Sequence, residues 1–163
     1  ASLNRVLSIP GEDPNTLGIK GLALKAMGRY GEAVEMLDRS LEGDPRNANG
    51  WYNRGLCLRE LGRHRDAIES FDRTLAMEKD LGVIWYNRGL AFLDLQDFAA
   101  AVESFDRSLA LEGNHFGSWY RRGIALAGLG RFREAVESLD HAIALSPQES
   151  PSWFHRGVAL AGL

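Results

Sequence analysis

The chain has few of the features that mark disulfide-bonded, nucleic-acid-binding or membrane-spanning proteins. A single cysteine, Cys57, excludes an internal disulfide and suits a reducing compartment. Acidic residues outnumber basic ones by 22 to 19, whereas proteins that bind nucleic acid or membrane surfaces through charge carry a basic excess. No apolar run approaches the roughly 20 residues that a membrane span requires. We therefore expect a cytoplasmic protein that binds neither nucleic acid nor membrane.

Residues that could build a catalytic or metal site are equally sparse. The four histidines lie at unrelated places in the chain, and no pair of them has metal-ligand spacing. The serines are scattered, and nothing in the sequence pairs a nucleophile with a base and a group to orient it. The sequence therefore predicts that the chain is not an enzyme and holds no cofactor or metal.

What the chain does contain is a phrase that recurs every 34 residues. It reads WYNRGLCL, WYNRGLAF, WYRRGIAL and WFHRGVAL in its four copies. Each copy opens on a tryptophan, at Trp51, Trp85, Trp119 and Trp153. A fixed period in this range is typical of stacked repeats rather than of a single globular fold.

The repeats can be aligned by giving each tryptophan position 4. Position 8 is then always glycine, position 20 always alanine and position 24 always a large apolar residue. We expect one array over residues 1–163, which begins and ends within a repeat and is either a fragment of a longer array or an array with truncated terminal repeats. Its predicted parts are a partial second helix in 1–13, four repeats in 14–47, 48–81, 82–115 and 116–149, and a first helix in 150–163.

Each repeat carries two apolar patterns with helical spacing. Positions 4, 8, 11 and 14 form the first pattern, and positions 20, 21, 24 and 28 form the second. Gly28, Gly62 and Gly130 suit the left-handed turn between the helices, whereas repeat 3 has Gln96 there. A glycine within a helix costs about 1 kcal/mol relative to alanine. The recurrence of glycine at position 8 therefore predicts a close approach of the paired helices, with the alanine at position 20 as its partner.

These residues resemble the tetratricopeptide repeat, a 34-residue helix–turn–helix unit with Trp, Gly, Ala, an aromatic residue and Pro at set positions. The resemblance implies an all-α fold: an α-solenoid of antiparallel helix pairs that forms a right-handed superhelix, with a concave groove lined by the first helices. Arginine departs from the family pattern where leucine is expected. We expect the stems of these arginines to cover apolar surface while their heads stay in water. The arginines are Arg54, Arg88, Arg122 and Arg156.

By this resemblance, positions 2, 5, 6, 9, 12 and 13 of the first helices line the groove. Aromatic rings supply contact area there, and asparagine amides can pair with both the donor and the acceptor of a peptide unit. We expect position 6 to face solvent, and some residues at positions 5 and 9 to pack against the neighbouring repeat. The predicted peptide-binding residues are Tyr52, Asn53, Leu56, Tyr86, Asn87, Leu90, Tyr120, Arg121, Ile124, Phe154 and His155.

Acidic residues also recur in pairs on the predicted second helices, as at Glu69 and Asp72. Recurrence at an exposed helical position predicts a solvated face. Each pair has a basic residue beside it, as Asp72 has Arg73, and such exposed ion pairs contribute little to stability. We therefore expect these acids to have no role in a site.

Together the patterns favour a protein–protein interaction scaffold that binds an extended peptide or partner segment in its groove. An alternative is the targeting arm of a larger multidomain enzyme, such as a transferase. RNA binding by helical repeats needs a basic groove, which the acidic balance disfavours. Head-to-tail self-association is a further hypothesis, with residues 3–9 of one molecule packing on residues 151–163 of the next.

Overall fold

The computed structural model of the protein describes residues 12–78 and 81–163. The predicted partial second helix in residues 1–13 lies outside this part of the chain, apart from Glu12 and Asp13. The N-terminal half of the self-association hypothesis lies outside it as well.

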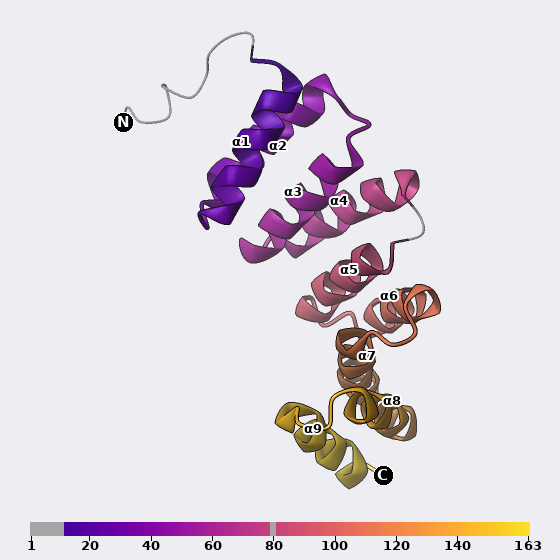
Figure 1. Ribbon diagram of the computed structural model, residues 1–163. Helices are drawn as coiled ribbons and strands as arrows, with labels where there is room; N and C mark the ends of the chain where they lie inside the picture. The colour runs from indigo at the N-terminus through magenta and orange to yellow at the C-terminus, as the bar shows by residue number, and fades with distance from the viewer. Residues whose placement is uncertain (1–11, 79–80) are drawn as a thin grey trace.

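The described residues form nine α-helices and no strand (Figure 1). The predicted all-α solenoid fold is therefore confirmed. The helices are α1 (Pro14–Ala26), α2 (Tyr30–Gly43), α3 (Ala48–Glu60), α4 (His64–Met77), α5 (Gly82–Asp94), α6 (Phe98–Leu111), α7 (Phe116–Gly128), α8 (Phe132–Leu145) and α9 (Ser150–Ala161).

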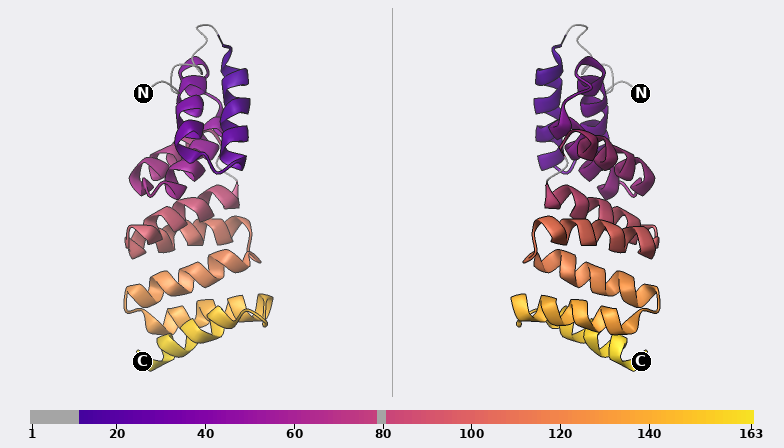
Figure 2. Two further views of the ribbon diagram at one scale, coloured as in Figure 1. Left: turned by 90° about the vertical axis from the view of Figure 1, so that its left-hand side faces the viewer. Right: turned by 90° about the vertical axis from the view of Figure 1, so that its right-hand side faces the viewer.

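The helices form two layers along one elongated stack, with α1 and α9 at opposite ends (Figures 1 and 2). Each helix packs against the helices before and after it in the chain. Successive odd-numbered helices also contact one another, whereas no such contact joins successive even-numbered helices among the described residues. The odd-numbered helices therefore form the tighter, inner layer. We call the side of this layer formed by positions 5, 6, 9 and 12 the inner face.

The turn inside each repeat has the same left-handed geometry throughout. Gly28, Gly62 and Gly130 all have a φ of 73°, as their identity predicts. Gln96 takes the same place in repeat 3 with a φ of 59°. The N–H of the next residue, Asp97, donates to the carbonyl of Phe92 at 2.9 Å. The N–H of Arg63, which follows Gly62, donates to the carbonyl of Leu58 at 2.8 Å in the same way. A glutamine can therefore hold this turn, although the left-handed conformation costs about 1–2 kcal/mol in a residue with a Cβ.

The glycine at position 8 is a point of close approach within each helix pair. A Cβ added to Gly89 would lie 2.6 Å from the Phe105 ring, and one added to Gly123 would lie 2.6 Å from Cγ of Leu139. The predicted close approach is therefore present, but its main partner is the side chain at position 24. The alanine at position 20 contributes its carbonyl oxygen, as Ala135 does at 3.3 Å from the same added Cβ of Gly123.

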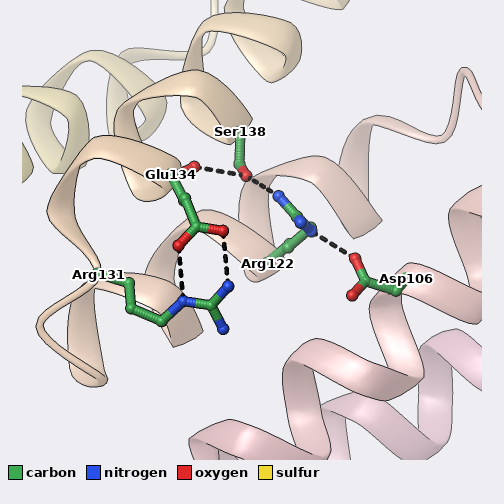
Figure 3. A network of polar contacts seen from close by, with 5 residues as sticks. All are labelled: Asp106, Arg122, Arg131, Glu134 and Ser138. Carbon is green, nitrogen blue, oxygen red and sulfur yellow. Dashed lines mark hydrogen bonds and ion pairs between the residues drawn. The ribbon is translucent and has the colours of Figure 1, made fainter.

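The arginine at position 7 joins two successive second helices. Arg122 Nε donates to Asp106 Oδ1 of α6 at 2.6 Å, and its Nη1 donates to Ser138 Oγ of α8 at 2.6 Å (Figure 3). Arg88 bridges Asp72 and Ser104 in the same way, at 2.7 and 2.8 Å.

These bridges correct two expectations about charged residues. The heads of Arg54, Arg88 and Arg122 are not left to water, because each is held between two second helices. Arg156 of α9 donates to Asp140 of α8 and to no other side chain among the described residues. Asp72 pairs with Arg88 of the next repeat rather than with its neighbour Arg73, which instead lies 3.9 Å from Glu69 and above the Trp51 ring. The recurrence of the aspartate in each pair therefore reflects the contact between repeats.

We predict that Gly89→Leu lowers the free energy of unfolding by about 1–3 kcal/mol, because the new side chain overlaps the buried Phe105 ring. Gly157→Ala is the matched control, since a Cβ at this glycine of α9 meets nothing within 4 Å. The control should be neutral or raise stability by up to about 1 kcal/mol through helix propensity. Urea denaturation measures both, and an unchanged midpoint for Gly89→Leu would contradict the close approach.

Candidate peptide-binding groove

The tyrosines at position 5 connect the first helix of one repeat to that of the next. Tyr52 lies with its ring centroid 6.1 Å from that of Phe71, and its hydroxyl accepts a hydrogen bond from Nδ2 of Asn87 at 3.2 Å. Tyr86 is placed similarly, 6.0 Å from Phe105, and its ring meets the ring of His115 edge-on at 4.8 Å. Burial raises the pKa of Tyr52. These rings therefore have a packing role, as was expected for some of the residues at position 5.

The asparagines at position 6 are buried, which contradicts the expectation that this position faces solvent. Asn53 is 5% exposed and Asn87 is 7% exposed. Nδ2 of Asn53 donates to the carbonyl of Asn49 at 2.8 Å, and Nδ2 of Asn87 donates to that of Val83 at 2.8 Å. Each amide thus bonds to its own helix four residues earlier. Arg121 and His155, at the same position in the last two repeats, are partly exposed.

The oxygen of each buried asparagine holds a cation from the repeat before it. Lys25 Nζ donates to Asn53 Oδ1 at 2.6 Å, and Arg59 Nη1 donates to Asn87 Oδ1 at 3.0 Å. Both cations come from position 12, which was placed on the groove side but given no role. A basic residue at position 12, followed 28 residues later by asparagine, is the sequence signal that could have revealed the pairing.

The cations of the inner face are incompletely neutralised. Arg59 lies 3.1 Å from Glu60, and Arg121 lies over the Tyr120 ring at 5.3 Å. In residues 12–78 and 81–163, neither Lys25 nor Arg121 has a carboxylate within ion-pair distance. The inner face therefore presents positive charge on a chain whose net charge is −3.

The residues at position 9 differ in burial along the array. Leu56 packs against the core of the first repeats, and Leu90 packs against that of the later ones. Ile124 is partly buried, whereas Val158 on α9 is 51% exposed. The apolar row at this position therefore serves mainly the core, except on α9.

Aromatic rings line the inner face between α7 and α9. Phe116 and Tyr120 stack at 5.9 Å with 7° between their planes, and Tyr120 and His155 stack at 5.6 Å with 20°. Phe154 lies beside His155 at 5.3 Å and is 67% exposed. The structure thus brings together the predicted residues of the last two repeats, and adds Phe116 to them.

The described residues show no cluster of side chains suited to metal binding. No group of three or more His, Cys, Asp or Glu side chains among them could hold a metal ion. Burial raises the pKa of the Cys57 thiol and keeps it protonated and unreactive. No helix in this part of the chain has the length and apolar character needed to cross a bilayer.

Comparison with known protein families identifies the repeat. The tetratricopeptide repeat model matches residues 20–82, 60–115, 86–150 and 120–163. No curated protein matches the chain.

Solved structures with similar folds include a crystal structure of MamA, with a TM-score of 0.88, 21% identity, and coverage of 91% of this chain and 81% of that chain. YrrB, described as a TPR protein with an unusual peptide-binding site, gives a TM-score of 0.82 and 21% identity over 91% of this chain and 77% of its own. The second TPR domain of human RPAP3, in complex with an HSP70 peptide, gives a TM-score of 0.67 and 24% identity. The match covers 69% of this chain and 94% of that domain. At these identities the likeness establishes the fold.

We predict that Arg121→Met raises the pKa of His155 toward its usual value. Burial is the main cause that lowers this pKa, and the charge of Arg121 adds to it. Because the folded state binds the proton less well than the unfolded state, the stability that neutral His155 contributes is fully present above the unfolded pKa of about 6.5 and is lost as the pH falls from there through the lower folded pKa. The variant should weaken this pH dependence.

NMR titration of the His155 imidazole checks the prediction. Arg107→Met is the control, because Arg107 is exposed on α6 and is not among the causes that lower the pKa of His155. A His155 pKa that is the same in both variants and in the parent protein would contradict the proposed effect of Arg121.

Proposed function

Since the chain belongs to the tetratricopeptide repeat family, we propose that it is a protein–protein interaction scaffold that binds an extended segment of a partner along the inner face. The segment runs across the odd-numbered helices, and the even-numbered helices act as the supporting layer. The array itself performs no chemistry in this proposal.

The observation that carries the proposal is the pairing of positive charge with aromatic surface on the inner face. Lys25 on α1 and Arg121 on α7 have no carboxylate partner among the described residues, while Arg59 lies between them on α3. Carboxylates of a partner would neutralise these cations through charge-assisted hydrogen bonds. The stacked rings of Phe116 and Tyr120 offer rigid contact area beside Arg121, at low cost in conformational entropy.

The comparisons support a peptide as the ligand. The structure of the human RPAP3 domain holds a peptide, SGPTIEEVD, which contains three acidic residues. YrrB is described as having a peptide-binding site. An acidic, extended segment is therefore the partner that we propose for this chain.

Of the predicted site residues, Asn53 and Asn87 have a supporting role in the proposal. Both are buried, and the side-chain oxygen of each accepts a hydrogen bond from a cation, so their main role is to hold Lys25 and Arg59 in place. A triple alanine variant at Asn53, Asn87 and Arg121 would therefore mix lost binding with lost stability. Binding is therefore tested by substitution of the cations themselves.

We predict that peptides selected from a random phage-displayed library bind about tenfold more weakly to Lys25→Met and to Arg121→Met, since each loses a charge-assisted contact. Methionine keeps most of the apolar stem of either side chain. Arg107→Met and Arg133→Met, at exposed sites on α6 and α8, are the controls and should bind within about twofold of the parent protein.

Fluorescence anisotropy with the selected peptides measures these affinities at two salt concentrations, and circular dichroism confirms that each variant is folded. Binding should weaken as salt screens the charges. Peptides that lose affinity for the control variants and keep it for the inner-face variants would overturn the proposal, as would a library that yields no binder.

A further inference from the structure

One repeat lacks the ring that the others place at position 5. Gly18 stands there in repeat 1, where the next three repeats have Tyr52, Tyr86 and Tyr120. A hollow of about 70 Å³ lies between α1 and α3 at this place. Its walls include Asn15, Gly18, Ile19 and Leu22 from α1, and Asn49 and Gly50 from α3. We call it the Gly18 hollow.

The neighbouring repeats show what occupies the equivalent space elsewhere. The hydroxyl of Tyr86 reaches position 2 of the next repeat, where a Cβ added to Gly117 would lie 3.0 Å from it. The residue at position 2 opposite Gly18 is Asn49, which lines the hollow. The hollow therefore lies where a tyrosine side chain of the preceding repeat would reach.

The hydrogen bonds of the buried asparagines also change with the missing ring. Where the tyrosine is present, Nδ2 of Asn87 donates to the Tyr52 hydroxyl. Opposite Gly18, Nδ2 of Asn53 donates to the side-chain oxygen of Asn49 at 2.8 Å instead. Asn49 is exposed, so its side chain can turn outward and leave this donor to an incoming hydroxyl.

The walls of the Gly18 hollow combine apolar and amide surface. Ile19 is 60% exposed, although it is a large apolar residue, and Leu22 is partly buried beside it. The side-chain amides of Asn15, Asn47 and Asn49 supply polar atoms on the other walls. A phenol matches this mixture, because its ring needs apolar contact and its hydroxyl both donates and accepts.

A cation lies close to the hollow on the same helix. Lys25 follows Leu22 by three residues, which places both side chains on one face of α1. Its ammonium group bonds to Asn53, whose amide bonds in turn to Asn49 at the hollow. Because Lys25 has no carboxylate partner among the described residues, a ligand that occupies the hollow can place an acidic group beside it.

We propose that the Gly18 hollow binds a tyrosine side chain of the partner segment, with an acidic residue of the same segment at Lys25. The partner thereby supplies the ring that repeat 1 lacks, and its hydroxyl takes the place of the Asn49 side chain as the acceptor from Asn53. This inference rests on the proposed function and specifies one residue of the ligand.

The most direct test uses a probe that depends on the hollow alone. N-acetyl-L-tyrosine amide is titrated at millimolar concentration into ¹⁵N-labelled protein. Saturable shifts are expected at the backbone amides of Gly18, Asn49 and Gly50 and at the side-chain amide of Asn53. The phenylalanine analogue should bind about fivefold more weakly, because it lacks the hydroxyl hydrogen bond, and the alanine analogue should cause no shift there.

Two variants of the protein sharpen this test. Gly18→Tyr fills the hollow from within and should abolish the shifts, although its Cβ would meet Ser40 Oγ at 3.1 Å and its folding must be checked. Ile19→Ala removes an exposed wall without burial cost and should weaken binding at least threefold. Leu111→Ala is its control, since Leu111 is also an exposed large apolar residue, on α6, and it should have no effect. Shifts that are absent, that are equal for all three probes, or that persist unchanged in Ile19→Ala would overturn the proposal.

The same question is then asked of the peptides selected from the library. Replacement of their tyrosine by alanine should weaken binding to the parent protein about tenfold or more. Peptides that bind the inner face equally well without tyrosine would overturn the hollow proposal and leave the proposed function standing. Selected peptides that do not bind the inner face at all would overturn the proposed function. The titration with N-acetyl-L-tyrosine amide would still show whether the Gly18 hollow binds a tyrosine side chain.

Discussion

The architecture depends on one steric constraint, the contact between the backbone of a first helix and a large side chain of its paired second helix. Glycine at position 8 lets the ring of Phe71 or Phe105, or the side chain of Leu37 or Leu139, lie where a Cβ would otherwise be. The helix pair is therefore held at a fixed distance and rotation in each repeat. That rotation decides which positions of the first helix turn toward the core and which remain for the inner face.

The contacts between repeats follow from the same rotation. Arginine at position 7 precedes the glycine, and it consequently reaches the second helix of its own repeat and that of the repeat before. Tyrosine at position 5 and asparagine at position 6 face the next first helix, where they join in bonds such as the one between Tyr52 and Asn87. The inner face is thus built from residues that also hold the repeats together. What it leaves for a ligand is the cations above the asparagines, the rings between α7 and α9, and the space beside Gly18.

The inner side of the array was expected from the family resemblance, whereas the 34-residue period was sufficient to predict the helices and the left-handed turns. Local patterns decide these features, because apolar spacing and turn glycines act within one repeat. The exposure of Asn53 and Asn87 was predicted wrongly, because their partners Lys25 and Arg59 lie 28 residues earlier, in another repeat. Asp72 was misjudged for the same reason, since its partner Arg88 is 16 residues away. Alignment of the repeats shows what recurs at a position, but it does not show which positions meet across a repeat boundary.

The central claim is that ligands bind to the odd-numbered layer of the array. A crystal structure of the protein with a library-selected peptide tests it most directly. The account predicts an extended peptide that crosses α1, α3, α5 and α7, with acidic groups at Lys25 and Arg121. A peptide bound only to the exposed faces of α2, α4, α6 or α8, with the inner face unoccupied, would contradict it.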